Sequence, residues 1–166
     1  KKMAAAGTNL VVVNKNILGN RKRPIPAIMD YRKHIEATSM LNTPPVFAIY
    51  VSMLTLRWLK ENGGVATMEK LNNQKSSLLY DAIDNSKIFK PTAAKEDRSK
   101  MNVCFVMDDV EKEKAFLDFA KQNNIYGIKG HRSVGGFRAS LYNALPLESV
   151  EYLVEKMKEF EKKEGV

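Results

Sequence analysis

Gly-Ile-Lys-Gly-His-Arg-Ser-Val-Gly-Gly-Phe-Arg-Ala, residues 127–139, is a glycine-rich turn that leads directly into a strand pattern. Over residues 137–142 apolar and polar side chains alternate, which predicts a strand with one buried face. The apolar residues 125–128 predict a second strand before the turn. Because only a short loop joins the two segments, we expect an antiparallel pair with Arg138 pointing away from the core.

The same stretch carries three basic side chains, His131, Arg132 and Arg138. Glycines allow a backbone to approach a ligand closely, and a guanidinium can form two parallel hydrogen bonds with a carboxylate or a phosphate. The stretch therefore predicts a site for two anionic groups of one small molecule. From composition alone, a solvated surface turn is an equally good interpretation.

Apolar periodicity on both sides of this stretch predicts the other elements of the C-terminal region. They are a helix over 65–86, an edge strand over 88–90, a strand over 101–107, a helix over 111–123 and a helix over 146–162. The region from residue 63 to residue 166 is therefore expected to be an α/β unit, with helices packed on one sheet.

The N-terminal region predicts a buried strand and a buried helix. Residues 8–13 form a continuous β-branched run, as in a strand covered on both faces. The sequence Asn42-Thr43-Pro44-Pro45 is a helix start, with Thr43 as a candidate N-cap. The helix that follows is apolar nearly all round until Gly63-Gly64 ends it, so we expect it to be buried between two domains.

Composition restricts the class of protein. With 166 residues, 28% charged and 44% hydrophobic, the chain is expected to be an ordinary globular protein without a membrane span. A single cysteine excludes an internal disulfide and favours the cytoplasm. The net charge of +8 comes from dispersed basic residues without interleaved aromatics, which favours a small phosphorylated ligand over nucleic acid.

Other candidate residues are few. No CxxC, HExxH or GxSxG pattern occurs, so a metal site or an acyl-transfer site has little support. We expect Cys104 to be a core residue and His34 to be solvated. Asn42 and Thr43 could bind a phosphate at the helix N-terminus, or simply cap the helix. Lys1 or Lys2, next to a turn of small residues, could supply a Schiff-base amine.

Taken together, these stretches resemble the phosphoserine aminotransferases, pyridoxal-phosphate enzymes with the type I aminotransferase fold. The resemblance covers essentially the whole chain, but only the second half of the family's length. The matching stretches are Ala6-Gly7, Pro24 to Tyr31, Ser39 to Pro45, Trp58 to Gly64, Arg98 to Val103, Gly130 to Ser140 and Tyr142 to Glu148.

The resemblance implies a division of the chain into three parts. Residues 1–43 would be a remnant of the large cofactor-binding domain, 44–62 an interdomain helix, and 63–166 the C-terminal small domain, mainly an antiparallel sheet with helices packed on it. Lys1 would be the Schiff-base lysine for pyridoxal 5'-phosphate, although Lys2, Ala4 and Ala5 depart from the family's pattern around it.

The resemblance also implies roles for the polar residues noted above. Asn42 and Thr43 would reach the cofactor phosphate of the partner subunit across a homodimer interface. His131 and Arg132 would bind the phosphate of phosphoserine, and Arg138 its α-carboxylate.

The reaction implied is amino-group exchange between glutamate and 3-phosphohydroxypyruvate, which gives phosphoserine and 2-oxoglutarate in serine biosynthesis. We expect the 166-residue chain alone to be inactive, because half of the cofactor pocket would be absent. The alternative is a non-catalytic domain that binds a small anionic metabolite.

Overall fold

A computed structural model describes residues 6–20 and 23–164. The chain divides into two compact units, one ending at Asn62 and the other beginning at Gly63. The first unit contains the short helices η1 (Lys15–Ile17), η2 (Ala27–Met29) and α1 (Tyr31–Glu36) and the longer helix α2 (Val46–Glu61). The second contains α3 (Gly64–Asp84), β1 (Lys90–Pro91), η3 (Lys95–Asp97), β2 (Asn102–Val106), α4 (Val110–Gln122), β3 (Phe137–Ser140) and α5 (Leu147–Lys163). No helix in the described part of the chain is both long and apolar enough to cross a bilayer.

The second unit is built on one three-stranded antiparallel sheet in the order β1-β2-β3. In its register Val103 pairs with Ala139 and Phe105 with Phe137, so all four side chains lie on the same buried face. Pro91 is tolerated in β1 because an edge strand has one side without ladder partners. The predicted α/β unit with an antiparallel sheet is confirmed.

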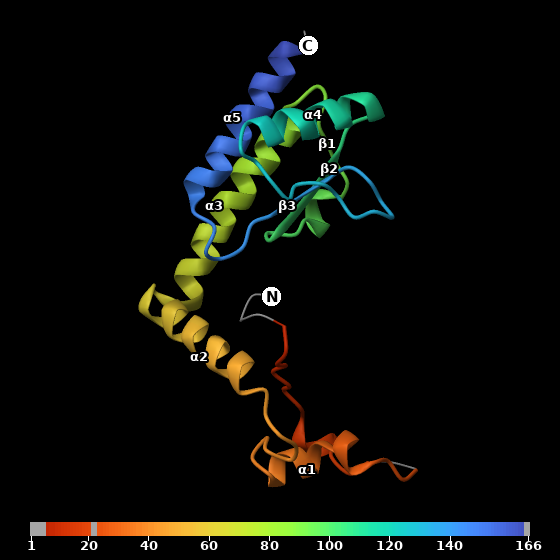
Figure 1. Ribbon diagram of the computed structural model, residues 1–166, viewed down its shortest axis with the longest axis vertical. Coiled ribbons are helices and arrows are strands. Elements are labelled where there is room, and N and C mark those ends of the chain that lie inside the picture. The colour runs from red at the N-terminus through yellow and green to blue at the C-terminus, as the bar shows by residue number, and fades with distance from the viewer. Residues whose placement is uncertain (1–5, 21–22, 165–166) are drawn as a thin grey trace. The chain divides into compact units, whose positions relative to one another are not determined.

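Helices α3, α4 and α5 supply the rest of the core over this face of the sheet. In Figure 1, α3 and α5 run side by side, as their tertiary contacts require. Aromatic rings fill the centre: the centroids of Phe105 and Phe137 are 4.9 Å apart, and that of Phe116 lies 4.9 Å from that of Phe89. The apolar stripe predicted for the last helix is confirmed, because Val150, Leu153, Val154, Met157 and Phe160 are all buried.

The strand predicted over residues 125–128 is wrong. After α4 the chain turns at Asn124, which has a positive φ of 58°, and the Ile125 N–H donates to the Ala120 carbonyl. Contact with β3 is limited to one bridge between Lys129 and Phe137 and a hydrogen bond from the Arg138 N–H to the Ile128 carbonyl. The segment approaches β3 at a single point and then diverges, so no ladder forms.

The buried strand predicted over residues 8–13 is also wrong. This segment has no regular secondary structure, and Leu10, Val11 and Val12 are 74%, 53% and 90% exposed. A strand needs a neighbouring strand to satisfy its backbone groups, and the described part of the first unit contains none. The β-branched run therefore stays extended.

Helix α2 differs from the prediction in its start and in its burial. It begins at Val46 after Pro45, without a side-chain cap, so the prediction of Thr43 as the N-cap is wrong. Only Ala48 is buried, whereas Phe47 is 78% exposed and Tyr50 is 53% exposed. The prediction that this helix is buried on most sides is therefore wrong for this chain.

Candidate functional site

Arg138 is turned outward by the alternation of strand β3. Its neighbours Phe137 and Ala139 are buried in the core, while Arg138 is exposed. Its backbone is held on both sides, since it pairs with Cys104 on β2 and its N–H donates to the Ile128 carbonyl at 2.7 Å. Among the described residues its guanidinium has no hydrogen bond or ion pair, so its five N–H donors are available to a ligand.

A closed loop precedes this strand and depends on two glycines. The Gly130 N–H donates to the Gly136 carbonyl at 2.8 Å, which joins the two ends of the loop. A Cβ atom on Gly130 would lie 2.0 Å from the Gly135 carbonyl oxygen. Gly136 has a φ of +61°, and a Cβ there would lie 2.7 Å from the Phe105 carbonyl oxygen. Only glycine fits this close approach of backbone to backbone.

His131 and Arg132 lie on this loop and are exposed. The Nδ1 atom of His131 lies 2.7 Å from the Ser133 hydroxyl oxygen and also accepts a hydrogen bond from the Ser133 N–H at 3.3 Å. Arg132, like Arg138, makes no side-chain hydrogen bond or ion pair with any described residue. Two unpaired guanidiniums and an imidazole are thus carried by one loop and the strand that leaves it.

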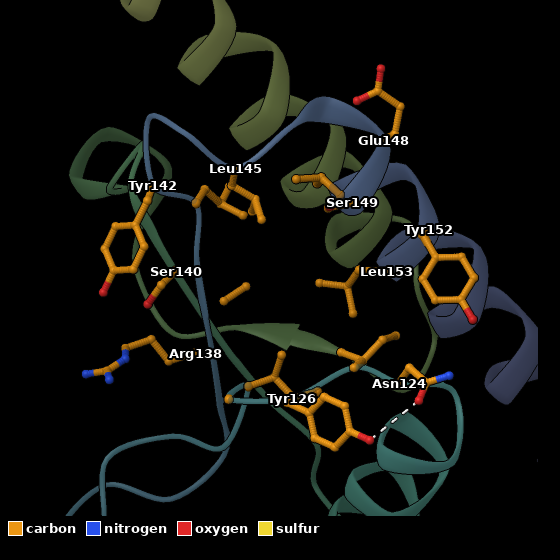
Figure 2. A pocket seen from close by; sticks show the side chains of 16 residues that line it. Asn124, Tyr126, Arg138, Ser140, Tyr142, Leu145, Glu148, Ser149, Tyr152 and Leu153 are labelled. Atoms are coloured by element: carbon orange, nitrogen blue, oxygen red, sulfur yellow. Dashed lines mark hydrogen bonds between the residues drawn. The ribbon is translucent and has the colours of Figure 1, made fainter. Parts of the chain in front are cut away.

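A cleft of about 700 Å³ lies where residues 125–128 diverge from β3. Figure 2 shows the side chains of Arg138, Ser140 and Tyr142 on one side of the strand, and Tyr126 and Tyr152 on the other. Leu145 and Leu153 add apolar surface, so the lining combines polar and hydrophobic side chains. Arg138 lines this cleft, whereas His131 and Arg132 do not. Tyr126 and Tyr152 carried no recognisable functional signal in the sequence.

The predicted cofactor-binding residues Asn42 and Thr43 lie in the first unit and are exposed. The Asn42 side chain donates a hydrogen bond at 3.3 Å to the Thr43 carbonyl. Because α2 begins three residues later without a side-chain cap, the Thr43 hydroxyl is not used by the helix. Lys1 and Lys2, the two candidates for the Schiff-base lysine, lie outside the described residues.

The two remaining chemically reactive residues behave differently from the prediction. Cys104 is half-buried rather than part of the core, because its neighbours Val103 and Phe105 take the inward face of β2. His34 is not simply solvated, since its Nε2 atom lies 2.7 Å from the Ile28 carbonyl oxygen. In the described ranges, no group of three or more histidine, cysteine or carboxylate side chains is arranged to hold a metal ion.

Lys75 is a buried charged residue that the sequence did not reveal. It lies on α3, is 1% exposed, and donates through Nζ to the carbonyls of Tyr142 and Leu145 at 2.7 and 3.0 Å. Burial lowers the pKa of Lys75. One turn earlier on the helix, the Asn72 side chain donates to the side chain of Asn143 at 2.9 Å. Helix α3 therefore holds in place the turn that follows β3, and residues of this turn line the cleft.

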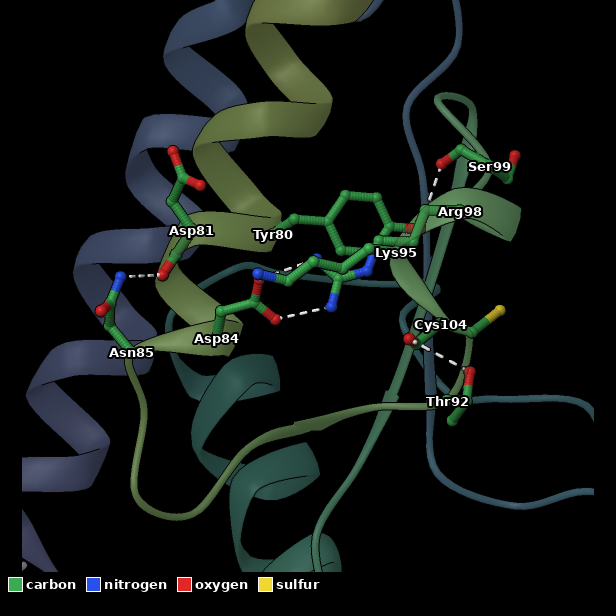
Figure 3. A network of polar contacts seen from close by, with 9 residues as sticks. All are labelled: Tyr80, Asp81, Asp84, Asn85, Thr92, Lys95, Arg98, Ser99 and Cys104. Carbon is green, nitrogen blue, oxygen red and sulfur yellow. Dashed lines mark hydrogen bonds and ion pairs between the residues drawn. The ribbon is translucent and has the colours of Figure 1, made fainter.

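A second polar cluster joins α3 to the segment before β2, as Figure 3 shows. The Arg98 guanidinium makes two hydrogen bonds to the Asp84 carboxylate, both 2.7 Å long, and lies 4.6 Å from the centre of the Tyr80 ring. The hydrogen bonds from Arg98 lower the pKa of Asp84, and burial raises the pKa of Tyr80. Because each of these groups is partnered within the chain, the cluster is structural.

Comparison with known proteins gives one family and many relatives. The model of the aminotransferase class-V family matches residues 1–153. A phosphoserine aminotransferase from Porphyromonas gingivalis is 56% identical over 165 residues, which cover 98% of this chain and 46% of that protein. The phosphoserine aminotransferase of Flavobacterium johnsoniae is 56% identical over 163 residues, with the same coverage. The chain thus spans about half the length of the curated relatives it matches.

Solved structures give the same result. A phosphoserine aminotransferase studied for radiation damage of its Schiff base aligns with a TM-score of 0.93 and 38% identity, over 98% of this chain and 46% of that chain. The Bacillus circulans subsp. alkalophilus phosphoserine aminotransferase aligns with a TM-score of 0.81 and 41% identity, covering 84% of this chain and 39% of its own. A PLP-bound phosphoserine aminotransferase from Trichomonas vaginalis aligns with a TM-score of 0.76 and 42% identity, covering 81% and 39%.

Proposed function

The chain belongs to the aminotransferase class-V family, and from this membership we propose that it is the C-terminal part of a phosphoserine aminotransferase. The whole enzyme would transfer an amino group between glutamate and 3-phosphohydroxypyruvate, giving phosphoserine and 2-oxoglutarate for serine biosynthesis. The identity of 56% to relatives of that name supports this substrate pair. We set aside a non-catalytic anion-binding domain, because the relatives compared above are named as aminotransferases.

The main observation in support is that the guanidiniums of Arg132, on the loop, and Arg138, on the strand, make no hydrogen bond or ion pair with any described residue. Arg138, at the rim of the cleft, would bind the α-carboxylate that all amino-acid substrates share. His131 and Arg132, on the loop before it, would bind the phosphate. Two anion sites held on a rigid strand and a closed loop would orient the substrate so that the same bond to its α-carbon reacts each time.

The donor set of the first unit fits the phosphate of pyridoxal 5'-phosphate. Asn42 and Thr43 are exposed, the Thr43 hydroxyl has no hydrogen-bond partner among the described residues, and the uncapped start of α2 leaves backbone N–H groups nearby. When bound, the cofactor supplies an electron sink for the carbanion character that develops at the substrate α-carbon. Lys1 would hold the cofactor, and its Nζ would accept the proton from the α-carbon.

Two further features belong to the same proposal. The enzyme would be a homodimer in which Asn42 and Thr43 of each subunit serve the cofactor phosphate bound by the other. It would be cytoplasmic, which agrees with the free thiol of Cys104.

The test compares Arg132→Ala and Arg138→Ala in the full-length enzyme. Arg138→Ala should lower kcat/KM for phosphoserine, glutamate and alanine alike, because all three carry an α-carboxylate. Arg132→Ala should lower kcat/KM most for phosphoserine, less for glutamate and least for alanine, because alanine has no second anionic group. A charge-assisted contact predicts a loss of about ten- to a hundredfold. Equal losses on all three substrates for Arg132→Ala would remove the phosphate role.

A further inference from the structure

The His131 ring uses only one of its two nitrogens inside the chain. Nδ1 lies 2.7 Å from the Ser133 hydroxyl oxygen and accepts the Ser133 backbone N–H at 3.3 Å. A backbone N–H can only donate, so Nδ1 must present its lone pair. A neutral imidazole with its lone pair on Nδ1 carries its proton on Nε2. The local geometry therefore fixes the tautomer as well as the orientation of the ring.

The loop holds this arrangement from the backbone side too. The His131 carbonyl accepts hydrogen bonds from the N–H groups of Val134 and Gly135, both at 2.9 Å. The link between Gly130 and Gly136 closes the loop around these residues. Nε2 has no hydrogen bond to any described residue, and His131 is exposed. Nε2 is therefore the ring nitrogen that remains for a ligand.

We propose that Ser133 is a positioning residue that holds His131 as an Nε2–H donor, so that His131 and Arg132 together present only hydrogen-bond donors to an anion of the phosphate class. That the anion is a phosphate rests on the proposed function, whereas the tautomer of the His131 ring follows from its contacts with Ser133 alone. A neutral donor beside a guanidinium can bind a phosphate oxygen without first taking up a proton. The same geometry argues against His131 as a general base, because its lone pair is engaged by Ser133.

The state of the ring can be measured on the chain itself without a ligand. The sequence contains two histidines, so ¹⁵N–¹H correlation spectra recorded at about pH 8 will contain two ring patterns. His34 is an internal reference, because its Nε2 lies 2.7 Å from the Ile28 carbonyl oxygen and must donate to it.

We expect His131 to show the Nε2–H pattern in the wild type and in Ser133→Thr, which keeps the hydroxyl. Ser133→Ala loses the 2.7 Å hydroxyl contact and keeps only the longer backbone N–H bond, so it should show a larger share of the Nδ1–H tautomer at His131 than the wild type and leave His34 unchanged. A protonated Nδ1 in the wild type, or a Ser133→Ala spectrum identical to the wild type, would overturn the proposal. Because Ser133 is exposed, none of these changes disturbs the core.

Titration with inorganic phosphate tests whether the Nε2–H group of His131 binds a phosphate. His131→Gln places an amide N–H near the position of Nε2, whereas the shorter His131→Asn places it near Nδ1. We expect His131→Gln to bind phosphate about as well as the wild type, and His131→Asn and Ser133→Ala to bind about three- to tenfold more weakly, the scale of one neutral hydrogen bond. Tighter binding by His131→Asn than by His131→Gln would overturn the Nε2 assignment. If the wild type keeps the expected ring pattern but binds no phosphate, the phosphate role under the proposed function is wrong and the tautomer assignment stands.

Discussion

The Nζ atom of Lys75 lies 2.7 Å from the carbonyl oxygen of Tyr142, although 67 residues separate them in the sequence. A second bond of 3.0 Å, to the Leu145 carbonyl, places one ammonium group across both ends of the turn that follows β3. The Leu145 N–H in turn donates to the Tyr142 carbonyl, so the turn is closed on itself as well as held by α3.

Lys75→Met should lower the free energy of unfolding by about 1–3 kcal/mol at alkaline pH, because two carbonyls lose their donor. Burial lowers the pKa of Lys75, so the folded state releases this proton at a lower pH than the unfolded state does. Between the lowered value and the unfolded value of about 10.4, the unfolded state binds more protons and stability rises with pH. The difference between wild type and variant should therefore grow from about pH 7 to about pH 9.5 in urea unfolding.

The matched control for this change is Lys70→Met, an exposed lysine on the same helix. We expect it to change the free energy of unfolding little, and by the same amount at both pH values. If Lys75→Met changed the free energy of unfolding equally at both pH values, folding would not lower the pKa of the Lys75 amine.

Asp84→Asn should lower the free energy of unfolding by about 0.5–1.5 kcal/mol near neutral pH, because it weakens two charge-assisted hydrogen bonds with Arg98 that lie at the partly exposed surface. Since Arg98 lowers the pKa of Asp84, this contribution is complete above the unfolded pKa of about 4 and is lost as the pH falls through the lower folded value. Wild type and variant should converge between about pH 5 and about pH 2. Asp108→Asn, whose ion pair with Lys90 is exposed, should show neither effect.

Gly136→Ala should destabilise the chain clearly more than Gly135→Ala. Both positions have a positive φ, 61° at Gly136 and 79° at Gly135, so backbone strain should destabilise each variant by about 1–2 kcal/mol. At Gly136 the added Cβ also lies 2.6 Å from a Val106 methyl group and 2.7 Å from the Phe105 carbonyl oxygen, whereas nothing lies within 4 Å at Gly135. Thermal unfolding of the two variants measures the difference, and equal melting temperatures would contradict this account of the loop.

Asn42→Ala and Thr43→Ala should each weaken cofactor retention in the full-length enzyme by about 1–2 kcal/mol, the scale of a hydrogen bond to a charged group. Equilibrium dialysis of pyridoxal 5'-phosphate measures this loss. In a mixed dimer of wild-type and variant subunits, the weakened site should be the one that binds its cofactor through the wild-type subunit's Lys1. A defect in the variant subunit's own site would contradict the arrangement across the interface.

Much of the second unit could be predicted because its signals are local. The alternation of Phe137, Arg138 and Ala139 placed the guanidinium outward, and the structure agrees. The stripe of α5 and the alternation of Val103 and Phe105 on β2 gave the core-facing sides correctly. The same alternation turns Cys104 away from the core, although cysteine as a residue type favours burial.

The sequence by itself determined where the helices of the second unit lie, which strand residues face the core, and which loop carries His131 and Arg132. These follow from side-chain periodicity and from glycine, which act over a few residues. The tertiary structure alone decided that Lys75 is buried against two carbonyls and that Arg98 pairs with Asp84, since each partner lies far along the chain. It also decided that residues 8–13 form no strand and that α2 is left uncovered, because a buried strand or helix exists only where other segments supply hydrogen bonds and apolar contacts.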